Sequence, residues 1–121
     1  MRAVNFDRPG PPEVMKVVDC DIPEINENQV LIEVKFAGVN RPDIIQREGN
    51  YPAPPGHSKI LGLEVSGLVS KVGSNVKGLK LGDKVASLVN GGGYSEYCIA
   101  DQETTFNNTK IGFAIYIDEY V

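Results

Sequence analysis

Apolar and polar residues alternate along several short stretches of the chain, and glycine or proline separates most of these stretches. The clearest stretch is 29–36 (QVLIEVKF), in which Val30, Ile32 and Val34 fall on one face and Leu31 on the other. A period of two predicts a β-strand, and apolar residues on both faces predict one that is buried on both sides. Similar stretches predict further strands at 1–6, 15–19, 61–72, 81–89 and 94–100.

The segments between these strands are rich in glycine and proline, which favour turns. Residues 90–93 contain three glycines, and we predict a hairpin turn there, with 94–100 pairing back on the strand before it. Gly62 and Gly67, inside the predicted strand 61–72, indicate a bulge or bend. Short strands joined by such turns favour a mostly antiparallel barrel or sandwich.

One segment has the residues of a helix instead. Asn40 can cap a helix, Pro42 is tolerated in a first turn, and Asp43 is placed to complete a capping box. Gly49 supplies the left-handed stop, so we predict a helix of about two turns. Residues 51–57, which include three prolines, are predicted to form an extended loop.

Composition and charge narrow the function classes. The chain has 121 residues with 12 Lys+Arg and 16 Asp+Glu, so its net charge is −4. Its length and its proportions of hydrophobic and charged residues are those of one globular domain. Its basic residues are scattered, which argues against nucleic-acid binding. Without a visible signal peptide or an apolar run of about 18 residues, we expect a soluble cytoplasmic protein away from membranes. Cys20, Cys98 and His57 are too few for a disulfide framework or a structural zinc site.

Six local motifs then occur in a characteristic order: 38–43 (GVNRPD), 49–51 (GNY), 54–56 (PPG), 60–67 (ILGLEVSG), 82–85 (GDKV) and 91–97 (GGGYSEY). Over residues 1–102 the chain thereby resembles the GroES-like domain of the medium-chain dehydrogenase/reductase superfamily. Within that superfamily it is most similar to the zinc-independent NADPH:quinone oxidoreductases related to zeta-crystallin. The resemblance implies a mostly β fold, a partly open β-barrel of short antiparallel strands with one or two short helices.

The resemblance also argues against a metal. Zinc alcohol dehydrogenases of the superfamily carry a Cys where this chain has Asn40, and a His where it has Leu63, immediately before Glu64. An amide and an isobutyl group do not replace a thiolate and an imidazole as zinc ligands. The chain also runs directly through 91–97 without the four-cysteine structural zinc lobe. We therefore expect no zinc.

The family's nucleotide-binding Rossmann domain is not recognised in these residues. The only glycine cluster, 91–93, has Glu96 where a third motif glycine would stand, and it leads into a β segment. Residues 103–121 depart from the family pattern, and we interpret them as a divergent tail that follows a truncation, with an apolar run at 111–117. We therefore expect NADPH, the family's cofactor, not to bind this chain by itself.

The parent reaction moves a hydride to a quinone or an enone, and negative charge grows on the substrate oxygen. The resemblance places Asn40 and Tyr51 at the active-site cleft as catalytic and substrate-binding residues, because an amide N–H and a phenol can donate to that oxygen. Arg41 is a further candidate for substrate binding.

Structural roles stay open for the same residues. Asn40 can be a helix cap only, Tyr51 a loop aromatic and Arg41 a solvated side chain. Glu64 is expected to be a structural hydrogen-bond acceptor or the partner of a basic residue, and Tyr94 a packing residue of the barrel.

Two functions follow. The first is the substrate-side fragment of an NADPH-dependent quinone or enone oxidoreductase, inactive alone and completed by a chain that carries the Rossmann domain. The alternative is a non-catalytic GroES-like module that binds or regulates, associating with itself or with a full-length relative. In either case the apolar run 111–117 and the flank that a Rossmann domain would cover favour a homo-oligomer.

Overall fold

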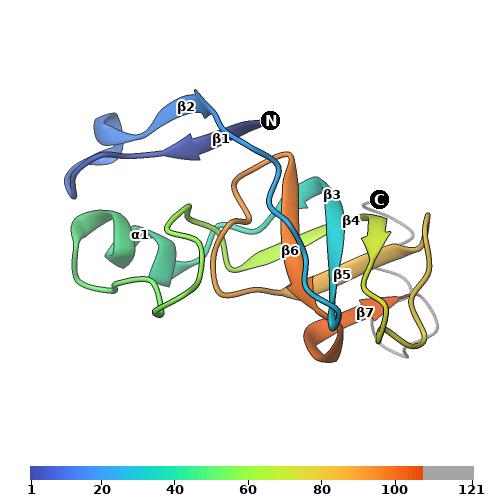
Figure 1. The fold of residues 1–121 in the computed structure, drawn as a ribbon. Helices are drawn as coiled ribbons and strands as arrows, with labels where there is room; N and C mark the ends of the chain where they lie inside the picture. The colour runs from blue at the N-terminus through green and yellow to red at the C-terminus, as the bar shows by residue number, and fades with distance from the viewer. Residues whose placement is uncertain (108–121) are drawn as a thin grey trace.

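The computed structural model describes residues 1–107, and the remaining residues, the predicted apolar run 111–117 among them, lie outside the described part. The elements of the described part, shown in Figure 1, are β1 (Arg2–Asn5), the 3-10 turn η1 (Pro12–Val14), β2 (Lys16–Asp19), β3 (Gln29–Ala37), α1 (Arg41–Glu48), β4 (Glu64–Val72), β5 (Lys84–Leu88), β6 (Tyr97–Asp101), the 3-10 turn η2 (Gln102–Thr104) and β7 (Thr105–Asn107). Within the described residues, no helix is long and apolar enough to cross a bilayer.

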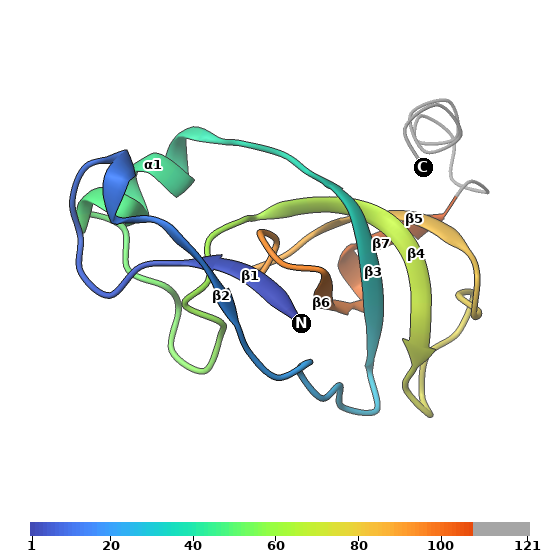
Figure 2. The ribbon, with the colours of Figure 1, turned by 90° about the horizontal axis from the view of Figure 1, so that it is seen from above.

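Five strands form one antiparallel sheet in the order β6-β3-β4-β5-β7, and β1 pairs with β2 in a separate hairpin. The large sheet curls into a half-barrel, which Figure 2 shows from above, and α1 lies at the end away from β7. A single antiparallel bridge, Ala3 to Ser95, ties the hairpin to the segment before β6. The predicted partly open barrel of short antiparallel strands with a short helix is therefore confirmed.

The inside of the curled sheet is filled by small β-branched residues. Val30, Ile32, Val65 and Val85 are each at most 1% exposed and pack in one cluster. Each fully buried side chain of this size contributes about 1.5–3 kcal/mol relative to an exposed one. Leu31, on the opposite face of β3, is also 1% exposed, which confirms that this strand is buried on both sides there.

The predicted bend in the sheet lies where β4 crosses β3. The β3–β4 register shifts twice, between Leu31 and Ile32 and between Val34 and Phe36, and Gly67 pairs with Val34 at the second shift. A Cβ atom on Gly67 would collide with the backbone carbonyl oxygen of Glu33. The strands thus approach each other so closely at the bend that only glycine fits.

Two predictions about β-structure are wrong. The strand predicted at 61–72 begins only at Glu64, because Gly62 has a φ of +108° and the chain there forms a loop. The hairpin predicted at 90–93 does not form: β5 pairs with β4 and β7, whereas β6 pairs with β3 at the other edge of the sheet. The reason is that Gly92 and Gly93 donate backbone hydrogen bonds to Ile60 and Gly62 (2.7 and 3.1 Å), so the chain follows that loop instead of reversing.

The sheet also continues into the segment that we assigned to the tail. Thr105 and Asn107 of β7 pair with Ser87 and Val85 of β5. The hydroxyls of Ser87 and Thr105 lie 2.9 Å apart in a buried hydrogen bond.

The bend can be tested by substitution. We expect Gly67→Ala to lower the free energy of unfolding by about 3 kcal/mol, because the new methyl group would overlap the backbone carbonyl oxygen of Glu33. Gly78→Ala is the control, since Gly78 has a φ of +80° but open space around it, and a left-handed alanine costs only about 1 kcal/mol. Urea unfolding measures both variants, and equal losses would contradict the close approach.

Candidate functional site

The start of α1 is fixed by a hydrogen-bonded turn. The backbone N–H of Asn40 donates to Oδ2 of Asp43 (2.9 Å), and the backbone N–H of Asp43 donates to the carbonyl of Asn40 (3.0 Å). At the other end, Gly49 has a φ of +96° and donates to the carbonyl of Gln46 (3.0 Å). The predicted beginning and end of the helix are thus confirmed.

The side chain of Asn40 faces the beginning of β4. Its Nδ2 donates to Oε2 of Glu64 (3.2 Å), and the backbone of Glu64 accepts the N–H of Gly38 (2.9 Å). Because a carboxylate only accepts, the NH₂ group of Asn40 must be the end that faces it, and one N–H of that group remains for another acceptor. The expected role of Glu64 as a hydrogen-bond acceptor is confirmed.

Asp43 and Tyr94 form a contact that sequence reasoning missed. The Tyr94 hydroxyl donates to Oδ2 of Asp43 (2.8 Å), and Asp43 is only 2% exposed. Burial, followed by the hydrogen bond to Asp43 and its negative charge, raises the pKa of Tyr94 well above its usual value. Tyr94 therefore stays a neutral donor over the whole physiological pH range. The two residues are 51 positions apart, and no spacing in the sequence links them.

One carboxylate oxygen thus links the start of α1 to the segment before β6. Oδ2 of Asp43 receives both the Asn40 backbone N–H and the Tyr94 hydroxyl, while Oδ1 is buried without a hydrogen-bond partner among the described residues. Hydrogen bonds to charged groups contribute about 1.5–3 kcal/mol each. The position of Asn40 between Asp43 and Glu64 is consequently held from both its backbone and its side chain.

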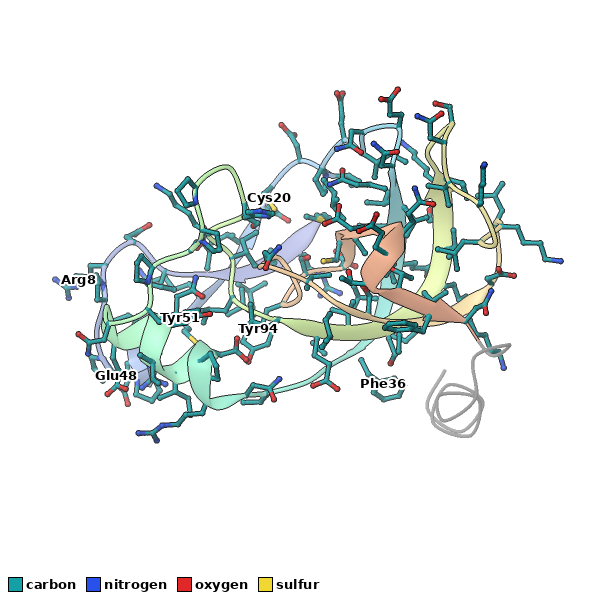
Figure 3. All side chains as sticks on the ribbon, turned by 90° about the horizontal axis from the view of Figure 1, so that it is seen from below. Arg8, Cys20, Phe36, Glu48, Tyr51 and Tyr94 are labelled. Atoms are coloured by element: carbon teal, nitrogen blue, oxygen red, sulfur yellow. The ribbon has the colours of Figure 1, made fainter. Side chains whose placement is uncertain are left out.

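The other two predicted site residues are exposed around the same helix. Arg41 is the first residue of α1, and Tyr51, which is 43% exposed, lies in the loop that follows the helix. In the described part of the chain neither side chain makes a hydrogen bond or an ion pair. Figure 3 shows Tyr51 and Tyr94 at the α1 end of the molecule, and Phe36 nearer the other end.

The structure thus brings Asn40 together with Glu64 and Asp43, but not with Tyr51. Asn40 and Tyr51 flank α1, whose eight residues span about 12 Å, and no hydrogen bond joins the two side chains in the described part of the chain. Both side chains have donor groups that remain available, which is what stabilisation of a developing oxyanion requires.

A groove of the described part lies elsewhere. It has a volume of about 780 Å³ and is lined by residues from four segments, 20–26, 56–60, 88–92 and 97–101, with Met1, Gln29, Ser95 and Thr104 at its margins. None of Asn40, Arg41 and Tyr51 lines it. The candidate site at α1 is therefore separate from this groove.

No group of three or more His, Cys, Asp or Glu side chains that could hold a metal ion occurs among residues 1–107. Cys98 lines the groove, and burial raises the pKa of its thiol to about 12, so it remains protonated at neutral pH.

Comparisons with known proteins give the family. Residues 26–121 match the family described as "Alcohol dehydrogenase GroES-like domain". A quinone oxidoreductase from Lama guanicoe is 41% identical over 109 residues, which cover 88% of this chain and 33% of that protein. Quinone oxidoreductase 1 from Escherichia coli is 43% identical over 82 residues, which cover 68% of this chain and 25% of that protein.

Solved structures agree with this result. The crystal structure of Escherichia coli quinone oxidoreductase complexed with NADPH superimposes with a TM-score of 0.78 and 34% identity, over 88% of this chain and 33% of that one. The human synaptic vesicle membrane protein VAT-1 homolog-like protein gives a TM-score of 0.82 and 32% identity. The chain spans about a third of the length of the curated relatives it matches. This chain belongs to the alcohol dehydrogenase GroES-like domain family and is homologous to the quinone oxidoreductases.

Proposed function

We propose that this chain is the substrate-side part of an NADPH-dependent oxidoreductase that reduces a quinone or an enone. The observation that carries the proposal is the fixed amide of Asn40, held by Glu64 and Asp43 at the start of α1 and surrounded by no metal-ligand set among the described residues. The homology to quinone oxidoreductases supports the substrate class.

The proposed chemistry of these residues is the stabilisation of charge. When a carbonyl accepts a hydride, negative charge develops on its oxygen, and a donor that is already in place lowers the barrier. The second N–H of Asn40 and the hydroxyl of Tyr51 would donate to this oxygen. Arg41 would contact the substrate, and Glu64 would keep the NH₂ end of Asn40 in position.

The nucleotide does not fit the glycine run of this chain. A pyrophosphate site needs free backbone N–H groups at a helix start, but Gly92 and Gly93 already donate theirs to Ile60 and Gly62. β6 and not a helix follows this run. We therefore assign no step of the hydride donor to the described residues and propose that a nucleotide-binding domain supplies it.

The glycine run leads to a direct test with the 121-residue chain alone. We expect no saturable rise in NADPH fluorescence at concentrations that saturate Escherichia coli quinone oxidoreductase 1, the positive control. The expected reason is that the donors a phosphate would need are engaged within the fold. Saturable binding by the isolated chain would contradict the assignment of the nucleotide to another domain.

The site residues can be tested in a chimera in which residues 1–107 replace the matching domain of Escherichia coli quinone oxidoreductase 1. Tyr51→Phe and Asn40→Ala should each lower kcat for quinone reduction by about a hundredfold, because each removes a donor to the developing oxyanion. Tyr97→Phe is the matched control and should leave kcat unchanged, since Tyr97 lines the separate groove. Unchanged rates in both site variants would contradict the catalytic roles and leave Asn40 and Tyr51 with structural roles only.

We also propose that the chain forms a homo-oligomer. Val39 and Leu81 are 76% and 67% exposed, and such large apolar side chains favour association when another surface covers them. The apolar run 111–117, which lies outside the described residues, is expected to contribute to the same association. Light scattering should show a dimer or larger species that becomes monomeric when 111–121 are deleted. A monomer at high concentration, unaltered by the deletion, would refute this association.

A further inference from the structure

The outer edge of β6 presents unused backbone donors. β6 pairs with β3 in a regular antiparallel register from Gln29–Asp101 to Glu33–Tyr97. The same register continues beyond both ends of the strand, where Val34 donates to Glu96 (2.9 Å) and Gln102 donates to Asn28 (3.2 Å). Since ladder bonds alternate along an antiparallel strand, the even-numbered residues of β6 bond to β3, and the odd-numbered ones direct their N–H groups away from it.

Another strand covers this edge only at its beginning. β1 reaches it through the Ala3–Ser95 bridge and through the hydrogen bond from Glu96 to the carbonyl of Arg2 (3.1 Å). From Tyr97 onward, no strand within residues 1–107 pairs with the outer side of β6, and the N–H groups of Tyr97 and Ile99 have no partner there. An edge of this kind is a template for a further strand.

The groove described above is lined by this same strand. Residues 97–101 line it together with the segments 20–26 and 88–92. In Figure 1 the segment that leads from β2 to β3 passes in front of β6. Five residues of extended chain span about 17 Å, the length of β6 itself. The groove of about 780 Å³ therefore provides space beside the unpaired donors of a whole strand.

The charge of the groove selects its occupant. Asp21, Glu24 and Asp101 line it, and no Lys or Arg does. Met1 also lines it, and its positively charged amino group donates to the carbonyl of Cys20 (2.7 Å). We propose that the free edge of β6 is a strand-addition site for an extended, basic segment of a partner polypeptide. Backbone hydrogen bonds to Tyr97 and Ile99 would hold the segment, and its Lys or Arg side chains would meet the carboxylates.

A second copy of this chain fits the groove poorly. The carboxylates of Asp21, Glu24 and Asp101 would face the same carboxylates of the other copy across such an interface. The strand-addition site is independent of the proposed oxidoreductase function, because none of Asn40, Arg41 and Tyr51 lines the groove.

The experiment uses the 121-residue chain and a fluorescent peptide of sequence Thr-Lys-Val-Lys-Val-Lys-Thr with blocked ends. We expect saturable binding by anisotropy that weakens with salt, together with slower amide exchange at Tyr97 and Ile99 on peptide addition. Exchange at Cys98 and Ala100 should be slow with or without the peptide, because these amides are bonded to β3. A peptide with Glu in place of Lys is the charge control and should bind at least tenfold more weakly.

Ile99→Pro tests the edge itself. Proline removes the outward N–H without breaking a bond to β3, and edge positions accept it, so the variant should keep its circular dichroism spectrum and lose at least tenfold in affinity. If the variant fails to fold, a peptide N-methylated at alternate residues makes the same test on the wild-type chain, and it should not bind.

Three outcomes would overturn the proposal. They are no saturable binding of the Lys peptide, equal binding of the Glu peptide, and protection of Tyr97 and Ile99 that grows with protein concentration without any peptide, which would assign the edge to a second copy. None of these measurements involves NADPH or a quinone, so their failure leaves the proposed oxidoreductase function unaffected.

Discussion

The docking of the glycine run on the loop before β4 determines the rest of the architecture. Gly92, Gly93 and Tyr94 donate in succession to the carbonyls of Ile60, Gly62 and Leu61, at 2.7, 3.1 and 2.8 Å. A Cβ atom on Gly62 would stand 2.6 Å from Cα of Gly93, so the two backbones touch without side chains between them. This contact leads the chain from β5 across the barrel to β6, and it carries Tyr94 to the start of α1. The candidate site and the open groove both depend on it.

The sequence allowed the individual elements to be predicted where local physics decides them. β3 has a strict alternation of apolar residues, and α1 has its capping residues Asn40, Asp43 and Gly49, so neither depends on distant contacts. The pairing partner of β6 could not be predicted in this way. Three consecutive glycines are typical of a hairpin turn. Here the carbonyl groups of Ile60, Leu61 and Gly62 accept hydrogen bonds from the glycine run, and these bonds favour the path from β5 to β6 over a hairpin. Nothing in a linear pattern shows that those acceptors will be there.

In the candidate site too, local features could be predicted from the sequence and contacts between distant segments could not. Asn40 and Glu64 were identifiable from the family motifs, and the structure joins them by a hydrogen bond of 3.2 Å. Tyr94 was expected to be a packing residue, yet its hydroxyl binds a carboxylate that is 2% exposed. That pairing exists because the glycine run delivers Tyr94 to α1, which is a property of the tertiary fold. The catalytic roles of Asn40 and Tyr51 and the substrate-binding role of Arg41 are proposals.

The sharing of one oxygen of Asp43 has a consequence for how this end of the molecule opens. Any fluctuation that draws α1 away from the segment after the glycine run breaks the hydrogen bond from Tyr94 to Asp43, while the turn at Asn40 moves with the helix. The Tyr94 hydroxyl and a carboxylate that is 2% exposed would then both lose a partner, which makes partial opening unfavourable. The helix and the segment that carries Tyr94 therefore form one cooperative unit, although they are far apart in sequence. Exposed Tyr51 lies outside this unit and is free to adjust to a bound molecule while its neighbours stay fixed.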